Sequence, residues 1–597
     1  MCRIAGMIDF ELPAAINQLT VENMCALQKH GGPDDGGIFV SQNEQLILGN
    51  RRLSLLDLSS DGHMPMAYLN RFFITYNGEI YNYKSLKTEL LHLGHQFSNQ
   101  TDTEVILAAF AQWGPLSFNR LKGMFAFALY DQQENELYLV RDTAGIKPLY
   151  YSSNTNGLVF ASEVRAFQAA ETKPANNPAW PIYLLAYGHI PEPVSTLQNV
   201  QSLPKGFYLK YELHTRSVSI QSFAHYSFSN QISDATEANQ LVAQQLEQAV
   251  EQHLLADAPI GVFLSGGLDS GIIAALASKY KNKDLNSLSI YFEEKAYSEK
   301  EYQDILIEHL QCNAYQLLLN ESAFNQSFPS ILNDMDMPSC DGINTWFISK
   351  YAADNGLKAV LSGVGGDELF GGYPSFNRMG KAILLQNLPG FINQIGKKSK
   401  YKRLNRMSYL QLDGLKGLYL FLRGNFTPHD IAQQLGAYET DVWNIVNDMP
   451  ILQDMPCLDD KNKASWVEFN MYMQNQLLRD SDVMSMIHGV EIRVPFLDDQ
   501  VIRLANSIQP ETKYAGALPK QFLIDAFVDD LPNAIWNRPK MGFSFPFAKW
   551  LSNSEYVKAL MENGNEQSNK NFQNFLSGKM HWSHMMSLVI LNHRKAI

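Results

Sequence analysis

The second residue of the sequence, Cys2, places a thiol beside the initiator methionine. If Met1 is removed, Cys2 carries a free α-amine. Such an amine titrates at about 8, so it can accept the thiol proton at neutral pH without a histidine. The resulting thiolate is a strong nucleophile. Taken alone, Cys2 is better explained as a spectator cysteine, so a catalytic role depends on the residues that surround it.

A second chemical signal is the loop SGGLDS at residues 265–270, which lies between a predicted buried strand and a predicted helix. Its glycines let the backbone approach a ligand, and the helix start offers unpaired N–H groups, so the loop suits a phosphate. It is not a Walker A loop, because no lysine follows. Asp269 would repel a phosphate unless a divalent cation bridges the two. The later loop SGVGGDELFGGY supplies Asp367 and Glu368, either of which can share an Mg²⁺ with Asp269.

The elements that position Cys2 are predicted to be mostly strands. The runs QLILGNRRLSLLD, RFFITYNGEIYN, GMFAFALYDQQENELYLVRD and GLVFASE are rich in β-branched and aromatic residues and are broken by Gly, Asn and Asp. Helical patterns occur at residues 17–30 and 101–114. Many strands with a few helices predict an α+β sandwich over residues 2–210.

The second half of the chain has a different pattern. Residues 211–235 are polar and weakly patterned, which predicts a connector. Strand and helix patterns then alternate around the two glycine-rich loops, which predicts an α/β domain with a parallel sheet and helices on both faces. From about Pro374 the patterns are largely helical, and this second domain is predicted to cover residues 236–597.

Composition excludes several classes of protein. A chain of 597 residues exceeds one hydrophobic core, and a net charge of −13 argues against a nucleic-acid partner. The basic run at residues 397–403 is interpreted as solvated surface, with contact to an anionic substrate as the alternative. Asp9 and Glu11 stand where a signal peptide needs an apolar core, and no apolar stretch approaches about 18 residues. The five scattered cysteines include no CxxC pair. We therefore expect a cytoplasmic protein without membrane insertion.

The motifs together resemble a known family. SGGLDS is similar to the pyrophosphate-binding loop of the PP-loop ATP pyrophosphatase synthetases. Its combination with MCRIAG, NGEIYN, TDTEV, EIRVPFLD and RPKMGF, in this order, resembles the glutamine-hydrolysing asparagine synthetase family over nearly the whole chain. The resemblance implies an N-terminal-nucleophile glutaminase domain. It also implies a synthetase domain that adenylates a carboxylate with ATP and displaces AMP with ammonia taken from glutamine.

The resemblance implies a role for individual residues. The catalytic residues would be Cys2 as nucleophile, Asn77 and Gly78 as donors to the oxyanion, and Lys540 as the group that steadies charge at the acyl-adenylate. The glutamine-binding residues would be Arg52, Leu53, Asn77, Gly78, Glu79 and Asp102. Arg52 would hold the α-carboxylate of glutamine, and Glu79 and Asp102 its α-amine. The ATP-binding residues would be Leu264, Ser265, Gly266, Gly267, Asp269, Ser270, Ile290, Ser362 and Gly363. Asp269 and Asp367 would hold Mg²⁺.

Two motifs depart from the family pattern. The family often has HRGPD near the glutamine pocket, whereas Gly31 replaces the arginine here, which puts the rigidity of the pocket in doubt. Asparagine synthetases also tend to have an acidic residue in SGEGSDE, and here Val364 takes that place. The acceptor is therefore aspartate or another carboxylate, such as a uronic acid of a surface-glycan precursor.

Other readings are less consistent with the motifs. Intact Cys2, Asp269 and Asp367 argue against a non-catalytic scaffold, and the complete glutaminase motifs argue against a β-lactam-forming relative. Free ammonia is mostly protonated in neutral water, so an enclosed passage between the domains is expected, although the sequence does not locate it. The oligomeric state is not fixed by the sequence, and a homodimer is compatible with it.

Overall fold

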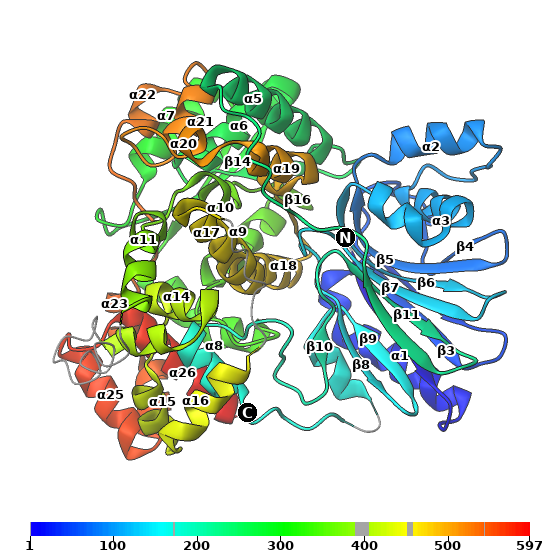
Figure 1. Ribbon diagram of the computed structural model, residues 1–597, viewed down its shortest axis with the longest axis horizontal. Helices are drawn as coiled ribbons and strands as arrows, with labels where there is room; N and C mark the ends of the chain where they lie inside the picture. The colour runs from blue at the N-terminus through cyan, green and yellow to red at the C-terminus, as the bar shows by residue number, and fades with distance from the viewer. Residues whose placement is uncertain (1, 171–172, 389–404, 450–457, 543, 597) are drawn as a thin grey trace.

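The computed structural model describes residues 2–170, 173–388, 405–449, 458–542 and 544–596. Met1, Cys457 and the basic run at residues 397–403 lie outside the described residues. Figure 1 shows two parts side by side, with the strand-rich N-terminal part in blue and cyan and the larger, helix-rich part in green to red.

Two antiparallel sheets of six strands form the N-terminal part. The first has the order β10 (Gln201–Ser202), β8 (Tyr150–Asn154), β9 (Gly157–Ala161), β1 (Cys2–Asp9), β3 (Leu46–Arg52), β2 (Asp35–Val40). The second has the order β12 (Ser217–Ser222), β11 (Phe207–Glu212), β7 (Glu136–Arg141), β6 (Gly123–Asp131), β5 (Phe72–Ile80), β4 (Met66–Tyr68). Helix α1 (Ala14–Leu27) packs on the first sheet, and α3 (Asp102–Trp113) with its neighbour α2 (Tyr83–His92) packs on the second. The predicted sandwich is confirmed.

The alternation of side chains along β1 sorts its residues between two cores. Ile4 and Ile8 lie in the core between the sheets, whereas Ala5 and Met7 belong to the core against α1. Successive strand residues face opposite sides. Cys2 and its neighbour Arg3 therefore leave the strand in opposite directions.

Part of the predicted connector is a strand. β12 pairs with β11 through six residue pairs, from Phe207 opposite Ser222 to Glu212 opposite Ser217. The sheet thus ends at Ser222, beyond the limit predicted at residue 210. All six residues of β12 are exposed, so this edge strand lacks the apolar alternation that marks a half-buried strand.

The second part is built on a parallel five-stranded sheet. Its order is β15 (Asn313–Leu319), β14 (Asn286–Phe292), β13 (Ile260–Phe263), β16 (Ala359–Leu361), β17 (Glu491–Arg493). The chain passes from β13 outward to β15 and then returns to the other side of β13 with β16. The loops after β13 and β16 meet at this reversal, which is where open α/β sheets bind ligands.

Helices surround this sheet, and the described residues that follow β16 are largely helical. The helices that alternate with its strands along the chain are α5 (Ala235–His253), α6 (Leu268–Lys281), α7 (Lys300–Leu310), α8 (Glu321–Asp334), α9 (Ile343–Asp354) and α10 (Gly366–Phe370). The others are α4 (Trp180–Tyr187), α11 (Ser375–Gln386), α14 (Gly414–Arg423), α15 (Pro428–Leu435), α16 (Glu439–Asp448), α17 (Asp460–Val467), a π-helix (Glu468–Leu478), α18 (Arg479–Met486), α19 (Asp499–Ser507), α20 (Pro510–Lys513), α21 (Gln521–Ala526), α22 (Asn533–Trp536), α23 (Phe547–Asn553), α24 (Glu555–Glu562), α25 (Glu566–Leu576) and α26 (Trp582–Ala596).

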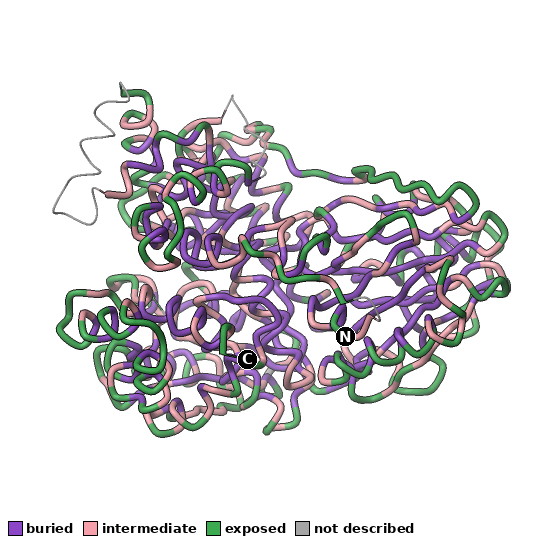
Figure 2. The backbone as a smooth tube through the Cα atoms, turned by 90° about the horizontal axis from the view of Figure 1, so that it is seen from below, coloured by how far each residue is buried: buried purple, intermediate pink, exposed green. Residues whose placement is uncertain are grey.

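The two parts contact each other through buried residues. The π-helix supplies Gln474, which donates to the Gly145 carbonyl, and Asn475, which accepts from the Glu192 N–H. Figure 2 shows buried backbone running through the interior of both parts, with exposed segments around the rim. Among the helices that the structure describes, none has the length and apolar character needed to cross a membrane.

Candidate active sites

The first candidate site surrounds Cys2 at the start of β1. Cys2 is buried and pairs with Arg52 of β3, and its backbone nitrogen donates to Asn77 Oδ1 at 3.3 Å. Burial raises the pKa of the Cys2 thiol, while a hydrogen bond from the Leu53 backbone and the charge of Arg52 oppose that rise. Strand pairing thus places Cys2 beside Arg52, and contact between the two sheets brings Asn77 to Cys2.

The predicted oxyanion donors lie on β5. Asn77 is fully buried, and its Nδ2 has no hydrogen-bond partner in the described part of the chain. A buried donor without a partner is costly, which is consistent with a group kept for a ligand. A Cβ on Gly78 would lie 2.2 Å from the Met124 carbonyl oxygen, so the close pairing of β5 with β6 requires glycine.

The predicted ligands of the α-amine are also buried. Asp102 begins α3, and its Oδ2 accepts from the Tyr76 hydroxyl at 2.8 Å and from the Ile80 N–H at 2.9 Å. Glu79 Oε2 accepts from Arg493 Nη2 at 3.1 Å. Burial raises the pKa of both carboxyl groups, and the charge of Arg493 opposes the rise at Glu79. Sequence reasoning missed Arg493, whose only signal was its place in the EIRVPFLD motif, which also contains Glu491 and Asp498.

The guanidinium of Arg52 holds a neighbouring loop. It donates to the carbonyl oxygens of Ser59 at 3.0 Å, Leu56 at 3.2 Å and Asp57 at 2.5 Å. The binding of the glutamine α-carboxylate by Arg52 therefore stays a prediction.

The departure at Gly31 has a structural counterpart in Arg3. A Cβ on Gly31 would lie 2.7 Å from Arg3 Cγ and 2.8 Å from Arg3 Nε. Arg3 is fully buried and donates to Glu163 Oε1 at 2.6 Å and to Asp482 Oδ2 of α18 at 2.8 Å. The space beside Gly31, the last residue of the 3₁₀ helix Lys29–Gly31, is thus filled by Arg3 of β1.

The second candidate site lies where β13 and β16 end. After β13, Gly266 has φ +88°, and the Ser270 hydroxyl accepts from the Ser265 N–H at 3.2 Å, so residues 265–267 form a tight turn against the first turn of α6. The second loop approaches closely: a Cβ on Gly363 would lie 2.8 Å from the Ser270 nitrogen, and one on Gly366 would lie 2.7 Å from Asp269 Cγ. Gly363 and Gly366 of the second loop are therefore needed for contact between the loops.

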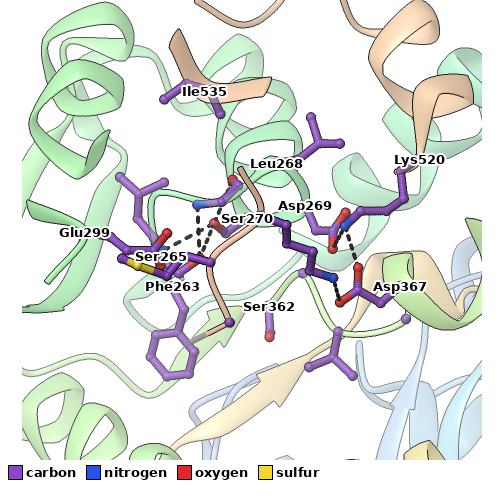
Figure 3. Close-up of a pocket in the computed structure, with 18 of the residues that line it drawn as sticks. Phe263, Ser265, Leu268, Asp269, Ser270, Glu299, Ser362, Asp367, Lys520 and Ile535 are labelled. Carbon is purple, nitrogen blue, oxygen red and sulfur yellow. Dashed lines mark hydrogen bonds and ion pairs between the residues drawn. The ribbon is translucent and has the colours of Figure 1, made fainter. Parts of the chain in front are cut away.

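A lysine that sequence reasoning missed bridges the two predicted metal ligands. Lys520 Nζ lies 2.6 Å from both Asp269 Oδ2 and Asp367 Oδ1, and Lys540 Nζ donates to Asp367 Oδ2 at 2.6 Å (Figure 3). The two lysines lower the pKa of Asp367 to about 2. Asp269 Oδ1 is buried without a hydrogen-bond partner in the described residues, and the pKa of Asp269 is raised by burial.

These residues line a cavity of about 380 Å³. The predicted ATP ligands on its wall are Leu264, Ser265, Gly267, Asp269, Ser270, Ile290, Ser362 and Gly363, whereas Gly266 is not part of the wall. Val364 lines the same cavity, as do Glu368 and Tyr373. Glu368 Oε1 accepts from the Tyr373 hydroxyl at 2.7 Å, and burial together with the charge of Asp367 raises the pKa of Glu368 to about 7.

Comparison with known proteins agrees with this arrangement. The family description "Asparagine synthase" matches residues 241–586, and "Glutamine amidotransferase domain" matches residues 1–224. Asparagine synthetase [glutamine-hydrolyzing] 1 of Bacillus subtilis is 28% identical over 585 residues, covering 94% of this chain and 90% of that protein. Putative asparagine synthetase [glutamine-hydrolyzing] 2 of Methanocaldococcus jannaschii is 32% identical over 444 residues, covering 70% of this chain and 83% of that protein.

A relative with a different name also spans most of the chain. Amidase chry2 of Gibberella zeae is 24% identical over 582 residues, covering 89% of this chain and 85% of that protein. The match to the synthetase model covers more than half of the chain and includes both glycine-rich loops, while the amidotransferase match includes Cys2 and Asn77. The chain is therefore an amidotransferase ligase that belongs to the asparagine synthase family.

Proposed function

We propose that the chain makes asparagine, by activating the side-chain carboxylate of aspartate with ATP and amidating it with ammonia from glutamine. The observation that carries the proposal is that one chain brings together two separate groups of the predicted site residues. Cys2 lies against Asn77 in one part, and Asp269, Lys520 and Asp367 meet at the strand ends of the other. Glutamine, ATP and a carboxylate acceptor would be the substrates.

In the first site, glutamine would be held by charge at its α-amino acid end. Arg52 suits the carboxylate, and Glu79 with Asp102 suits the ammonium. The Cys2 sulfur attacks the side-chain amide carbon after its proton passes to the α-amine of Cys2. Asn77 Nδ2 and the Gly78 N–H then donate to the oxyanion, a contribution typically worth about 3–4 kcal/mol for one such donor. Ammonia leaves, and water releases glutamate from the sulfur.

In the second site, the loop at residues 265–270 would hold the phosphates of ATP. Asp269 and Asp367 are suited to a divalent cation, because both are carboxylates at the ends of neighbouring strands and one oxygen of Asp269 is unpartnered. Mg²⁺ held there would supply positive charge to the departing pyrophosphate. Lys520 contacts both carboxylates and Lys540 contacts Asp367. The two lysines would add positive charge on the protein side as the acyl-adenylate forms.

The base for the amidation step would be Glu368. Val364 cannot act as an acid or base, whereas Glu368 lies in the same loop and on the same cavity wall. A carboxyl group with a pKa near 7 is half ionised at neutral pH and can accept a proton from the attacking ammonia. Ammonia would travel between the sites through the buried contact between the two parts.

The alternative acceptor is another carboxylate, such as a uronic acid of a glycan precursor. It is favoured by Val364, which puts an apolar side chain where the family tends to have an acidic one. The deciding experiment measures pyrophosphate release with ammonium across a panel of carboxylates, with aspartate beside free and nucleotide-linked uronic acids. Release with aspartate supports asparagine synthesis. Strong turnover of a uronic acid with none for aspartate would show that the acceptor is a uronic acid, and the proposed steps of adenylation and amidation would be unchanged.

A further inference from the structure

Arg493 belongs to the synthetase part of the chain, yet one end of its guanidinium contacts the glutaminase part. Nη2 donates to Glu79 at 3.1 Å, while Nε donates to Glu491 at 2.5 Å. Nη1 donates to the carbonyl oxygens of His253 at 2.8 Å and Leu255 at 2.6 Å. Arg493 is fully buried. Because every nitrogen of its planar guanidinium group donates a hydrogen bond, the Arg493 side chain has one orientation. It therefore fixes the position of the Glu79 carboxylate.

The backbone of the same residue reaches the ATP cavity. The Arg493 carbonyl accepts from the Ser362 N–H at 2.8 Å, and Ile492 and Ser362 both line the cavity. One residue of β17 therefore touches a predicted ATP ligand through its backbone and a predicted glutamine ligand through its side chain.

We propose that Arg493 is a positioning residue that completes the glutamine site across the domain interface, by holding the Glu79 carboxylate for the α-ammonium of glutamine. This inference rests on the glutamine-binding role proposed for Glu79. It adds that the glutaminase site is assembled only when the synthetase part is docked against it.

The charges around Glu79 explain why an arginine is needed. Burial and the carboxylates of Asp102 and Glu491 raise the pKa of Glu79, and Arg493 is the side chain that opposes them. An α-ammonium ion is bound by a carboxylate and not by a neutral carboxyl group. Removal of the guanidinium thus weakens recognition of the ammonium end of glutamine and leaves the amide end untouched.

The test compares glutamine with 4-carbamoylbutanoate, which has the same amide and carboxylate but lacks the α-amine. The rate of hydrolysis is measured for the full-length wild type and for Arg493→Met. The expected result is a fall of about 10- to 100-fold in kcat/KM for glutamine, the range of one hydrogen bond to a charged group. The fall is carried by KM, while the rate with the analogue stays within about twofold. Arg493→Lys should recover part of the preference for glutamine, because it keeps the charge and loses the fork.

Three variants separate this role from a general structural one. Arg479→Met removes another buried arginine that crosses the interface, where Nη1 donates to the Ile190 carbonyl at 2.8 Å, and it should keep the wild-type preference for glutamine. Equal losses for both substrates in Arg493→Met, or no loss for either, would overturn the inference. If Arg493→Met does not fold, an unchanged preference in Arg493→Lys overturns it. Glu79→Gln is measured in parallel, since an unchanged preference there refutes the role of Glu79 itself.

Discussion

Arg3 occupies the space that any side chain at position 31 would need. The Arg3 Cγ lies 2.7 Å from the position of a Cβ on Gly31, and the guanidinium continues into a buried group of charges that includes Glu163 and Asp482. Burial of these charges is compatible with stability because each is paired. The identities of residues 3 and 31 are therefore coupled by volume and by charge.

This coupling predicts the outcome of exchanging the two residues. Gly31→Arg alone should lower the thermal midpoint by roughly 2–12 °C, since overpacking costs about 1–3 kcal/mol and each kcal/mol shifts Tm by about 2–4 °C. The double variant with Arg3→Gly should recover most of the loss, because the guanidinium then enters the same space from position 31. Additive losses in the double variant, measured by calorimetry, would show that the two sites are independent.

Removal of the nucleophile should separate the two activities. Cys2→Ala should abolish glutamine hydrolysis and glutamine-driven synthesis, and leave synthesis from ammonium salts. Cys25→Ala is the matched control, since Cys25 is equally buried and packs from α1 against β3 rather than in the glutaminase site. Intact-mass measurement of the active protein should show that Met1 is absent, and full activity with Met1 retained would rule out the α-amine as the base.

The carboxylate and lysine cluster should control pyrophosphate release. Asp269→Asn removes one charge from the proposed cation site and one partner of Lys520, so ATP-dependent pyrophosphate release should fall by several orders of magnitude while glutaminase activity persists. Lys520→Met should also slow release, by about 10²-fold or more, because the two carboxylates then repel each other. The control is Asp304→Asn, which removes an exposed partner of Lys300 on α7. A wild-type rate in Asp269→Asn would contradict the assignment.

The role of Glu368 predicts a pH profile. The folded-state pKa of about 7 means that the carboxylate form needed for a base increases as pH rises through 7. The rate of acceptor amidation with ammonium should therefore rise between about pH 6 and 8. In Glu368→Gln this rise of the rate with pH should disappear, and the rate itself should fall by about 10²–10⁴-fold. Since the ammonia fraction also rises with pH, rates are compared at equal free ammonia, and an unchanged profile in the variant would exclude Glu368.

Val364 predicts a gain of function. If aspartate is the acceptor, Val364→Glu should increase aspartate-dependent pyrophosphate release, because it adds a carboxylate on the cavity wall. Val364→Gln is the matched control of similar size without the charge. Equal rates in the wild type and both variants would show that this position does not contribute to the acceptor site.

The sequence by itself determined the local chemistry of this protein. SGGLDS between a strand and a helix predicts a phosphate loop, because glycine backbone freedom and a helix start depend only on neighbouring residues. Alternating and periodic patterns likewise predicted the sandwich and the parallel sheet. The pattern failed at β12, since an edge strand exposed on all its residues carries no apolar alternation.

Only the tertiary structure decided which distant side chains complete the two sites. Lys520 lies 251 residues from Asp269, and Arg493 lies 414 residues from Glu79. No local sequence pattern predicts the contact of Lys520 or of Arg493, because each side chain is placed by the packing of whole elements against the ends of the sheet. The same holds for Arg3 and Gly31. Neither residue alone indicates a contact in the sequence, and the contact is seen only because β1 packs against the segment before β2.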